Sequence, residues 1–441
     1  MKKIKCVILG YGLRGQAYAK YALLRPEELE IIAVIDFSSI GREKAKQDFN
    51  LPDSALFDSL DSFIEKGIDC DLIVNATMDT YHYETSVKIL KAKYNMLLEK
   101  PVSSKSEEVK EIARLAKENN CAVFVCHVLR YTPFYSKIKE IIDSDEIGKV
   151  ISIQANEHIW HGLFVDAFVR GKWSNEKECG SGLLLSKCCH DTDLLCWLNN
   201  ATKPVEVSSF GSRSFYSPEN APKNATKYCF DCPAKDDCMF DAYKFQLKLN
   251  CIPNYVFGQM GKPVDSITDQ EKIEYMKNHK AGECVFNMET DLVDRQSVSI
   301  NFANGSIATL NMIGAATRAG RKMHVVCEYG ELDGDLETNT IIYRKFNKHA
   351  VNEKYVSDER MYTQTILHPE LDSKGDNPVD ASHHGGDYFI MKDIVDLLNG
   401  KIKKSTKNAM TTIEDSIDGH FVVYAAEKSR KERKIVSLSE I

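Results

Sequence analysis

The sequence predicts an α/β protein with an N-terminal doubly wound parallel sheet and a C-terminal α/β domain built on a large, mostly antiparallel open sheet. Buried apolar strands alternate with helices over residues 1–128, which is the pattern of parallel βαβ units. Beyond about residue 130 the pattern changes to polar β-like runs, Ser297 to Ala303 and Ile307 to Ile313, with a hairpin signal between them. A chain of 441 residues also exceeds what a single core usually serves.

The first strand and turn carry a dinucleotide-binding motif. The apolar run Cys6 to Leu9 leads directly into Gly10-Tyr11-Gly12-Leu13-Arg14-Gly15. The first glycine allows a sharp turn, the second lets backbone N–H groups approach a pyrophosphate, and the third lets the next helix pack closely on the sheet. The pyrophosphate would lie at a helix N-terminus, where unpaired N–H groups favour negative charge. The motif therefore predicts a Rossmann domain.

A carboxylate closes the second strand and predicts which coenzyme is bound. Ile31 to Ile35 has the composition of a buried parallel strand, and Asp36 follows Gly15 by about twenty residues. An aspartate there hydrogen-bonds the ribose hydroxyls and repels a 2′-phosphate, so NAD is expected and NADP is less favoured. Ser38 and Arg42 lie just beyond, and they leave phosphate binding open as the alternative.

The rest of the first domain continues the alternation of strands and helices. A short strand delivers Glu99-Lys100-Pro101 to the carboxyl edge of the sheet, where ligands bind in open α/β folds. The predicted elements are helix 44–49, strand 71–75, helix 83–92, strand 95–98, helix 109–117 and strand 121–126. The candidate coenzyme residues are Gly10, Tyr11, Gly12, Leu13, Arg14, Gly15, Asp36, Ser38, Arg42, Asn75, Ala76, Thr77, His82, Glu99 and Lys100.

Two helices are expected near the C-terminus. Phe389 to Leu398 is amphipathic, and the His383-His384-Gly385-Gly386-Asp387 segment before it could close over a substrate or only cap the helix. Thr411 to Lys428 is expected to return to the first domain. The predicted domains are a coenzyme domain over 1–128, a substrate and oligomerisation domain over 129–408 with an insertion at about 215–285, and a returning helix and strand over 409–441.

Composition excludes some classes of protein. The formal net charge of -7 argues against a nucleic-acid partner, and no apolar run approaches the ~20 residues of a membrane span. The fourteen cysteines are scattered through predicted strands and helices, which suits reduced thiols better than a disulfide framework. A cytoplasmic protein is therefore expected.

Lys100 is the candidate for handling the substrate proton. Moving hydride from a secondary alcohol to a nicotinamide requires a group that takes the hydroxyl proton as the carbonyl forms. Lys100 ends a strand beside Pro101, which restricts the backbone before it, so the ammonium could be held near the reacting carbon. The alternative is a loop lysine in a surface ion pair with Glu99.

A second group of polar side chains lies in the apolar stretch from Leu183 to Leu198. Lys187, His190, Asp193 and Trp197 recur at steps of three and four residues, which places them on one helical stripe. Ionisable groups in so apolar a helix are costly unless they face a functional site, so a substrate site is favoured over a core histidine. His190 would act as base or relay, Asp193 would orient it, and Lys187 would bind a neighbouring hydroxyl.

Three motifs together resemble those of the Gfo/Idh/MocA oxidoreductases: the run from Gly10 to Gly15, Glu99-Lys100-Pro101, and Lys187 through His190 to Leu195. The resemblance covers nearly the whole chain. It implies a Rossmann domain followed by an α/β domain whose open sheet forms oligomer interfaces, and so a homo-oligomer, either a dimer or a tetramer. It also implies hydride exchange between a nicotinamide coenzyme and a sugar, inositol or related polyol, with Lys100 as the catalytic residue.

One position departs from the family pattern. Many relatives carry an aspartate four residues before the histidine, whereas this chain has Ser186 there and Lys187 next. If Lys187 takes over that role, the site is more cationic, and the substrate could carry an acidic group.

Further candidate substrate contacts lie near the domain junction and in one loop beyond it. An aromatic and basic loop could stack on a sugar ring, and tryptophans that simply hold the loop down explain its composition equally well. The candidates at the junction are His127 and Arg130, those in the loop are Trp160, His161, Arg170 and Trp173, and His384 is the candidate near the C-terminus.

Clustered cysteines indicate a metal in the insertion. Cys229, Cys232 and Cys238 are spaced as C-x2-C-x5-C in a polar stretch without an obvious core. A structural Zn²⁺ can fold such a stretch, because the ion supplies what apolar burial cannot. The spacing does not fix a fourth ligand, for which Cys284 and Cys251 are candidates, and free thiols are an equal alternative.

These patterns predict an NAD-dependent dehydrogenase for a sugar, glycoside or cyclic polyol. Two alternatives remain open. One is a glycosidase or lyase that oxidises the sugar transiently, eliminates the aglycone and reduces the product again. The other is a coenzyme-bound regulator without catalysis.

Overall fold

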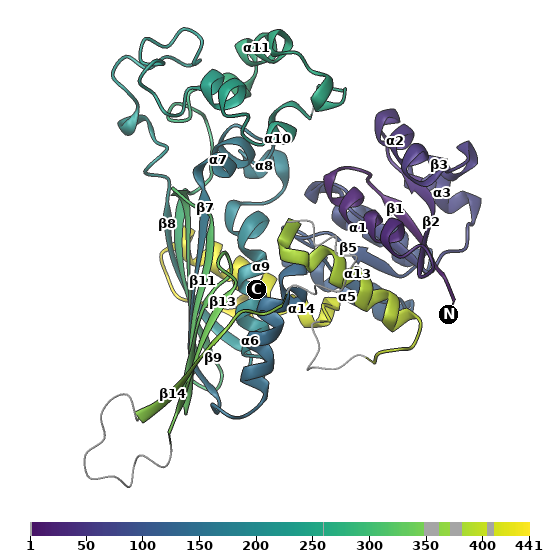
Figure 1. Cartoon of the computed structure of the whole chain (residues 1–441), viewed down its shortest axis with the longest axis vertical. Helices are drawn as coiled ribbons and strands as arrows, with labels where there is room; N and C mark the ends of the chain where they lie inside the picture. Colours follow the sequence, from purple (N-terminus) through teal and green to yellow (C-terminus); the bar gives the residue numbers. More distant parts are fainter. Residues whose placement is uncertain (1, 259, 348–360, 371–381, 404–409) are drawn as a thin grey trace.

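The computed structural model describes residues 2–258, 260–347, 361–370, 382–403 and 410–441. Figure 1 shows two lobes side by side. One lobe holds a small sheet with its helices, and the other holds a long sheet seen edge-on, with helices on the side that faces the first lobe. The sheets have six and nine strands, and the predicted combination of a parallel sheet with a large, mostly antiparallel sheet is confirmed.

The six-stranded sheet is parallel throughout, with the order β3-β2-β1-β4-β5-β6. The chain runs outward from β1 to β3 and then crosses to β4 on the other side of β1. The gap between β1 and β4 is therefore the switch point at which open α/β sheets bind ligands. The elements are β1 (Ile4–Leu9), α1 (Leu13–Leu24), β2 (Leu29–Ile35), α2 (Ser39–Phe49), β3 (Leu56–Phe57), α3 (Leu60–Lys66), β4 (Leu72–Asn75), α4 (His82–Lys91), β5 (Met96–Leu98), α5 (Ser106–Glu118) and β6 (Val123–Val125).

The nine-stranded sheet has the order β14-β13-β12-β11-β7-β10-β9-β8-β15, and its one parallel pair among the described strands is β7 with β10. The predicted hairpin of two polar strands is β9 and β10, whose register pairs Asn301 with Ile307. The strands are β7 (Val150–Trp160), β8 (Pro204–Ser212), β9 (Arg295–Phe302), β10 (Ile307–Ala316), β11 (Gly320–Cys327), β12 (Gly330–Asp335), β13 (Thr340–Phe346), β14 (Tyr362–Leu367) and β15 (Val436–Ser437).

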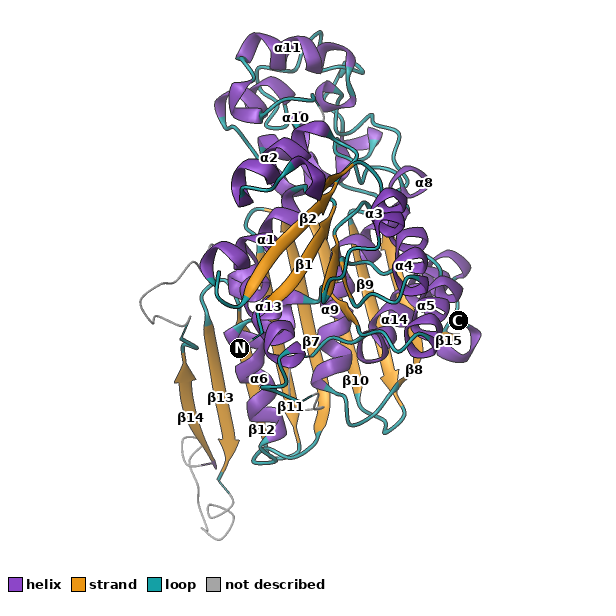
Figure 2. Cartoon of the chain, turned by 90° about the vertical axis from the view of Figure 1, so that its right-hand side faces the viewer, coloured by secondary structure: helices purple, strands orange, loops and turns teal. Residues whose placement is uncertain are grey.

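Helices cover one face of this sheet, as Figures 1 and 2 show: α6 (Pro133–Asp143), α9 (Leu183–Leu198) and α14 (Ile413–Glu432). In β10 the alternating residues Ala308, Leu310 and Met312 are fully buried, which places them against the helices. Ile307 and Ile313 alternate with them and are exposed on the opposite face. The sheet therefore has one face in the core and one face open.

The C-terminal segment crosses back to the first lobe. Apolar residues of α13 (Gly386–Leu398), among them Ile390 and Ile394, are part of the core of the six-stranded sheet. Thr411 then runs beside β6, where its carbonyl oxygen accepts from Val125 N at 2.7 Å. The helix α14 contacts α9, β8 and α5, so it lies against both lobes.

A long insertion separates β8 from β9 and occupies residues 213–294. Its described residues form loops and short helices, including α10 (Pro253–Phe257) and α11 (Asp269–Asn278). Figure 1 shows it at the top of the molecule, beyond the end of the long sheet at which β7 and β8 are labelled. No helix in the described part of the chain is long and apolar enough to cross a lipid bilayer.

Candidate active site

The glycine turn after β1 is built as the motif requires. Gly10 has a φ of 87°, and a Cβ placed on it would lie 2.7 Å from Ala76 O. A Cβ on Gly15 would lie 2.0 Å from Gly10 O, so both positions require glycine. Gly12, the N-cap of α1, has nothing within 4 Å of an added Cβ. The open space at this helix N-terminus fits a pyrophosphate.

Asp36 closes the turn from the other side. Its Oδ2 accepts from Tyr11 N at 2.6 Å, and its Oδ1 accepts from Ser38 N at 2.8 Å. The Arg42 guanidinium donates to Asp36 O at 2.5 Å, so it holds the end of β2. The carboxylate is thus fixed at the end of β2 beside the glycine turn, at the place where a ribose would lie.

The segment after β4 is held in place by side chains. Asn75 Nδ2 donates to Thr85 Oγ1 at 2.8 Å, and Asn75 Oδ1 accepts from Thr77 Oγ1 at 2.9 Å. His82 is fully buried, with its ring nitrogens 2.6 Å from Pro101 O and 3.0 Å from Thr77 O. Both nitrogens face backbone carbonyls, and the predicted contact of His82 with the coenzyme stays a prediction. His82 instead joins the loop after β4 to the loop after β5.

Arg14 lies in an ion-pair network rather than free at the turn. Its Nε donates to Glu99 Oε1 at 2.6 Å, and Nη1 and Nη2 donate to the two oxygens of Asp387 at 2.9 and 2.6 Å. Tyr18 OH also donates to Glu99 Oε1. The guanidinium of Arg14 contributes to lowering the pKa values of both carboxyls, against the effect of burial. The network ties the first helix to α13, near the other end of the chain.

Lys100 reaches across to the second lobe. Its backbone N donates to Glu99 Oε2 at 2.8 Å, and its half-buried side chain donates from Nζ to Ser186 O at 2.7 Å. Ser186 lies one helical turn before His190 on α9. The lysine and the histidine, which come from the two predicted motifs, are therefore brought together.

His190 is a buried imidazole whose Nδ1 has no hydrogen-bond partner in the part of the chain that the structure describes. Burial, together with the charge of Lys100, lowers its pKa well below the ordinary 6.5. Two more imidazoles lie near it, since the His127 ring is 5.7 Å away and the His383 ring 6.0 Å away between centroids. A neutral imidazole beside an ammonium can accept a proton from a substrate hydroxyl.

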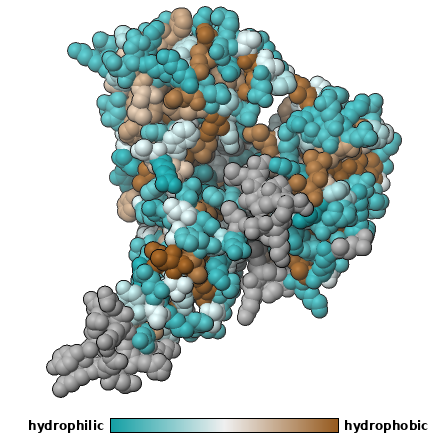
Figure 3. Space-filling view, in the orientation of Figure 1, coloured by the Kyte–Doolittle hydropathy of each residue, from teal (hydrophilic) through white to brown (hydrophobic). Residues whose placement is uncertain are grey.

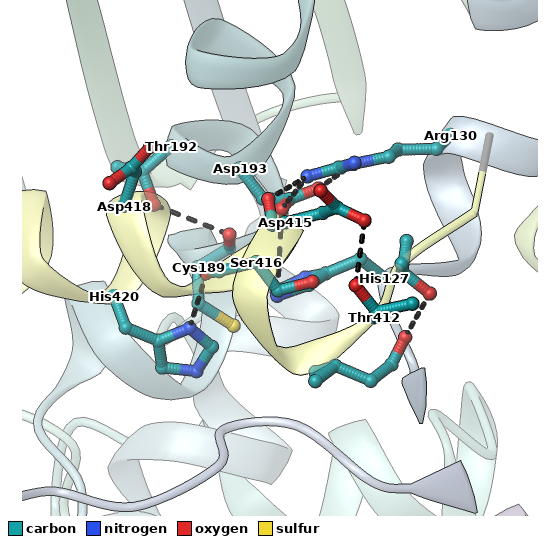
Figure 4. A network of polar contacts seen from close by, with 12 residues as sticks. His127, Arg130, Cys189, Thr192, Asp193, Thr412, Asp415, Ser416, Asp418 and His420 are labelled. Atoms are coloured by element: carbon teal, nitrogen blue, oxygen red, sulfur yellow. Dashed lines mark hydrogen bonds and ion pairs between the residues drawn. The ribbon is translucent and has the colours of Figure 1, made fainter. Parts of the chain in front are cut away.

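Figure 4 shows the groups behind the site, where Asp193 points at Arg130. Arg130 Nε and Nη2 donate to the two Asp193 oxygens at 2.7 and 2.5 Å, and all three side-chain groups in this corner, including His127, are buried. Both Asp193 oxygens are held by the Arg130 guanidinium, so any effect of Asp193 on the orientation of His190 would act through the position of α9. The predicted substrate contact by Arg130 stays a prediction.

His127 lies between these groups, and neither ring nitrogen has a hydrogen-bond partner among the described residues. Its Nε2 is 3.7 Å from Asp193 Oδ1, and its ring is 5.4 Å from that of His420. Burial lowers its pKa well below the ordinary value. His127 thus stands behind His190, as a neutral group within the domain junction.

Lys187 is part of a charged cluster that the sequence did not indicate. Its Nζ is 3.1 Å from Glu157 Oε1, and Arg321 bridges Glu157 and Asp191 at 2.9 and 2.8 Å. Glu157 and Arg321 come from the neighbouring strands β7 and β11. Asp191 follows His190 directly in the sequence motif. The sequence shows this neighbouring position, but it does not show that Asp191 pairs with Arg321.

Lys172 is a further residue that sequence reasoning missed. Its Nζ lies 3.1 Å from the sulfur of Met78, in the loop after β4, and 4.2 Å from the ring centre of Trp173. Burial lowers its pKa, and Lys100 adds to that effect. A further cationic side chain therefore approaches the same region.

The side chains of the aromatic and basic loop make packing contacts and hydrogen bonds within the second lobe. Arg170 is buried against the insertion, where it donates to Glu283 O and Phe240 O at 2.8 and 2.7 Å, and its predicted contact with substrate stays a prediction. Trp173 packs on other aromatic rings, and His161 meets Phe240 edge-on at 5.7 Å. Trp160 packs against the larger core.

His383, and not the predicted substrate residue His384, lies near His190. His383 Nδ1 lies 3.2 Å from Asp387 Oδ2 and 3.3 Å from Arg14 Nη1. His384 Nε2 instead lies 3.8 Å from Glu337 Oε1 on the far side. The predicted substrate contact by His384 stays a prediction, and His383 is the one of the two histidines whose ring lies near that of His190.

Two family profiles match this chain. The profile described as "Oxidoreductase family, NAD-binding Rossmann fold" matches residues 4–127, and the profile described as "GFO/IDH/MocA C-terminal domain" matches residues 135–237. The chain belongs to the Gfo/Idh/MocA oxidoreductase family. It is thus a member of an oxidoreductase family with a Rossmann domain that binds NAD(P).

Individual relatives agree with this assignment. The Bacillus subtilis protein YteT, named as an oxidoreductase, is 22% identical over 331 residues, which are 74% of this chain and 72% of YteT. D-xylose dehydrogenase of Paenarthrobacter nicotinovorans is 30% identical over 142 residues, 32% of this chain and 36% of that enzyme. Among solved structures, levoglucosan dehydrogenase in complex with NADH and levoglucosan has a TM-score of 0.69 at 14% identity, covering 99% of this chain and 100% of the other. That last likeness shows the fold.

Proposed function

We propose that this family member is an NAD-dependent dehydrogenase that oxidises a ring hydroxyl of a sugar, glycoside or cyclic polyol to a ketone. The observation that carries the proposal is the contact of Lys100 Nζ with Ser186 O at 2.7 Å. It places an amine one helical turn from the neutral imidazole of His190, at the carboxyl end of the parallel sheet. Hydride transfer from an alcohol needs such a pair beside the reacting carbon.

The chemistry divides between coenzyme and protein. A nicotinamide coenzyme, when bound, takes the hydride from the carbon that bears the hydroxyl. Lys100 donates a hydrogen bond to the substrate oxygen and stabilises the negative charge that grows there. His190 accepts the hydroxyl proton, because its lowered pKa keeps the imidazole neutral. Lys187 and Arg321 donate hydrogen bonds to neighbouring hydroxyls of the substrate. Their positive charges are balanced by the carboxylates of Glu157 and Asp191.

Relatives support the substrate class. D-xylose dehydrogenase and 1,5-anhydro-D-fructose reductase act on sugars by name, and levoglucosan dehydrogenase binds levoglucosan beside NADH. A crystal structure of the Bordetella pertussis dehydrogenase WlbA contains NADH and UDP-GlcNAcA, in a fold that matches with a TM-score of 0.66. An anionic sugar is therefore one member of the proposed substrate class, alongside neutral ones.

Asp36 supports NAD over NADP. Asp36→Ala removes the carboxylate that would repel a 2′-phosphate, so the affinity for NAD should fall and its margin over NADP should narrow. Titration of the protein with each coenzyme measures both constants. Asp53→Ala, which removes an exposed carboxylate of the same lobe, should leave the ratio unchanged. An unaltered ratio in Asp36→Ala would contradict the ribose assignment.

A panel of sugars, inositols and glycosides with NAD⁺ tests the proposed reaction. NADH absorbance and product mass are followed together. A dehydrogenase forms NADH in step with a ketone that is two hydrogens lighter than its substrate. Cleavage of a glycoside without accumulation of NADH would identify the glycosidase or lyase alternative, and retained coenzyme binding with no turnover on any compound would identify a regulator.

Two broader parts of the proposal concern assembly and location. The open face of the long sheet, with exposed Ile307 and Ile313, is proposed as the interface of a homo-oligomer, either a dimer or a tetramer. Sedimentation at several concentrations would reveal a monomer if this is wrong. A cytoplasmic location fits the fourteen cysteines, all of which are unpaired.

A further inference from the structure

The insertion between β8 and β9 packs partly on the larger core and partly around a small apolar cluster of its own. Buried insertion residues such as Phe240 belong to the larger core, whereas the separate cluster forms around Phe257. Phe230, Met239 and Leu249 remain 45%, 58% and 65% exposed, and Figure 3 shows hydrophobic residues among hydrophilic ones over this top part of the molecule. A bound metal ion is one means of stabilising a part of the chain with so small a cluster of its own.

Four thiols of the insertion line one small cavity: Cys229, Cys232, Cys238 and Cys284. The strand-like segments at 227–229 and 282–284 run side by side, because Cys229 N donates to Gly282 O at 2.9 Å and Cys284 N donates to Lys227 O at 2.8 Å. A tight turn then brings in Cys232, whose N donates to Cys229 O at 3.2 Å. The other candidate from the sequence, Cys251, is not in the cavity lining.

Two charged side chains in the lining have atoms without partners. Arg170 and Asp241 are 2% and 4% exposed, and Arg170 Nη1 and Asp241 Oδ2 make no hydrogen bond. Among the described residues, no carboxylate forms an ion pair with Arg170, whose Nη2 instead lies 3.4 Å from Cys229 Sγ. Buried charged groups with unsatisfied atoms beside four thiols are accounted for by an ion bound among them.

We propose that Cys229, Cys232, Cys238 and Cys284 bind a structural zinc ion. Four thiolates around one divalent ion carry an excess of negative charge, and the Arg170 guanidinium next to Cys229 offsets part of it. In the described part of the chain no three metal-binding side chains stand ready around one point, so the thiols must draw together as the ion binds. Coupling of ion binding to loop closure is the usual behaviour of structural zinc sites.

Metal analysis of the full-length protein tests the proposal. The protein is expressed in zinc-supplemented medium, purified without chelator, and its zinc, iron and sulfide contents are measured. We expect about one zinc ion per chain, as in other structural sites. Replacement by Co²⁺ should give the strong visible absorption of tetrahedral cobalt thiolate. This spectrum reports the ligands without relying on any mutant.

Cysteine variants identify the ligands. Cys232→Ser and Cys284→Ser should each lose most of the zinc and the cobalt–thiolate spectrum, whereas Cys251→Ser, which changes a buried thiol of the same insertion outside the cavity, should keep both. Four freely titratable thiols without zinc, a disulfide among them, or iron with sulfide would overturn the proposal. Zinc retained at full content in both ligand variants would also overturn it.

Discussion

Two side chains from separate motifs, Lys100 and His190, form the chemical centre of the proposed site. The lysine is anchored by Ser186 O, and the histidine is kept neutral by burial and by the cationic side chains around it, Lys100 first among them. Each residue alone has a structural explanation, as an ion-paired loop lysine or a core histidine. Their meeting across the domain junction is what favours catalysis.

Replacing Lys100 separates chemistry from coenzyme binding. Lys100→Met removes the hydrogen-bond donor for the substrate oxygen but leaves the glycine turn untouched. We expect kcat/KM to fall by at least a factor of about 100, as loss of a transition-state donor usually causes, with NAD affinity within a few fold. Lys105→Met, an exposed lysine of the next loop, should behave like the unchanged protein. Turnover that survives in Lys100→Met would remove this residue from the mechanism.

The pH dependence of the reaction reports on His190. A base must be neutral to act, and burial, Lys100, His127, His383 and Arg321 all lower its pKa below the ordinary 6.5. The acid limb of kcat/KM should therefore lie below pH 6.5, since only there does His190 become protonated in the free enzyme. An acid limb well above that value would contradict a buried, neutral His190.

At the scale of elements, buried ion pairs hold the helices around the site. Asp193 on α9 and Arg130 after β6 form a two-pronged pair, and Arg130 Nη2 also donates to Asp415 O of α14 at 3.0 Å. The pair joins three segments that are far apart in the sequence. Its role is to fix α9, and with it His190, relative to the first lobe.

Breaking the Asp193–Arg130 ion pair should lower the free energy of unfolding more than breaking an exposed ion pair does. Asp193→Asn leaves the Arg130 guanidinium buried without a counter-charge, so the free energy of unfolding should fall by about 3 to 5 kcal/mol. Asp418→Asn in the adjacent helix breaks an exposed pair with Lys203 and should cost at most about 1 kcal/mol. Denaturant titration measures both values. Equal, small losses in the two variants would show that the buried pair is unimportant.

Local motifs could be predicted from the sequence, whereas the ion-pair partners of the site residues could not. Gly10, Gly15 and Asp36 were identifiable because their roles depend on short-range spacing. The partner of Asp193 lies 63 residues away, and that of Arg14 lies 373 residues away, distances over which periodicity carries no information. His383 and His384 both adopt left-handed backbone conformations, with φ of 51° and 50°, so helical or strand spacing could not indicate which one faces the site.

At the scale of the whole molecule, the C-terminal helices α13 and α14 pack against the first lobe. Arg14 links Glu99 to Asp387, and α13 thereby packs on the parallel sheet. Further on, His420 Nε2 accepts from Val102 N at 3.0 Å, and Tyr424 OH donates to Ser103 O at 2.5 Å, so α14 holds the segment after Lys100. The loop that carries Lys100 is thus held by contacts from both α1 and α14.

Replacing Arg14 should weaken the packing of α13 on the first lobe. Arg14→Met leaves the buried carboxylates of Glu99 and Asp387 without their shared cation, so amides of residues 386–398 should exchange with deuterium faster and the melting temperature should fall. Arg114→Met changes an exposed arginine of the same lobe and should alter neither. Unchanged exchange in that helix would refute the coupling.

The most direct test of the account is a crystal structure with NAD⁺ bound. We expect the pyrophosphate at the N-terminus of α1 against Gly12, the ribose at Asp36, and the reactive carbon of the nicotinamide facing the space between Lys100 and His190. A dinucleotide bound elsewhere, or a nicotinamide ring turned away from those two side chains, would contradict it.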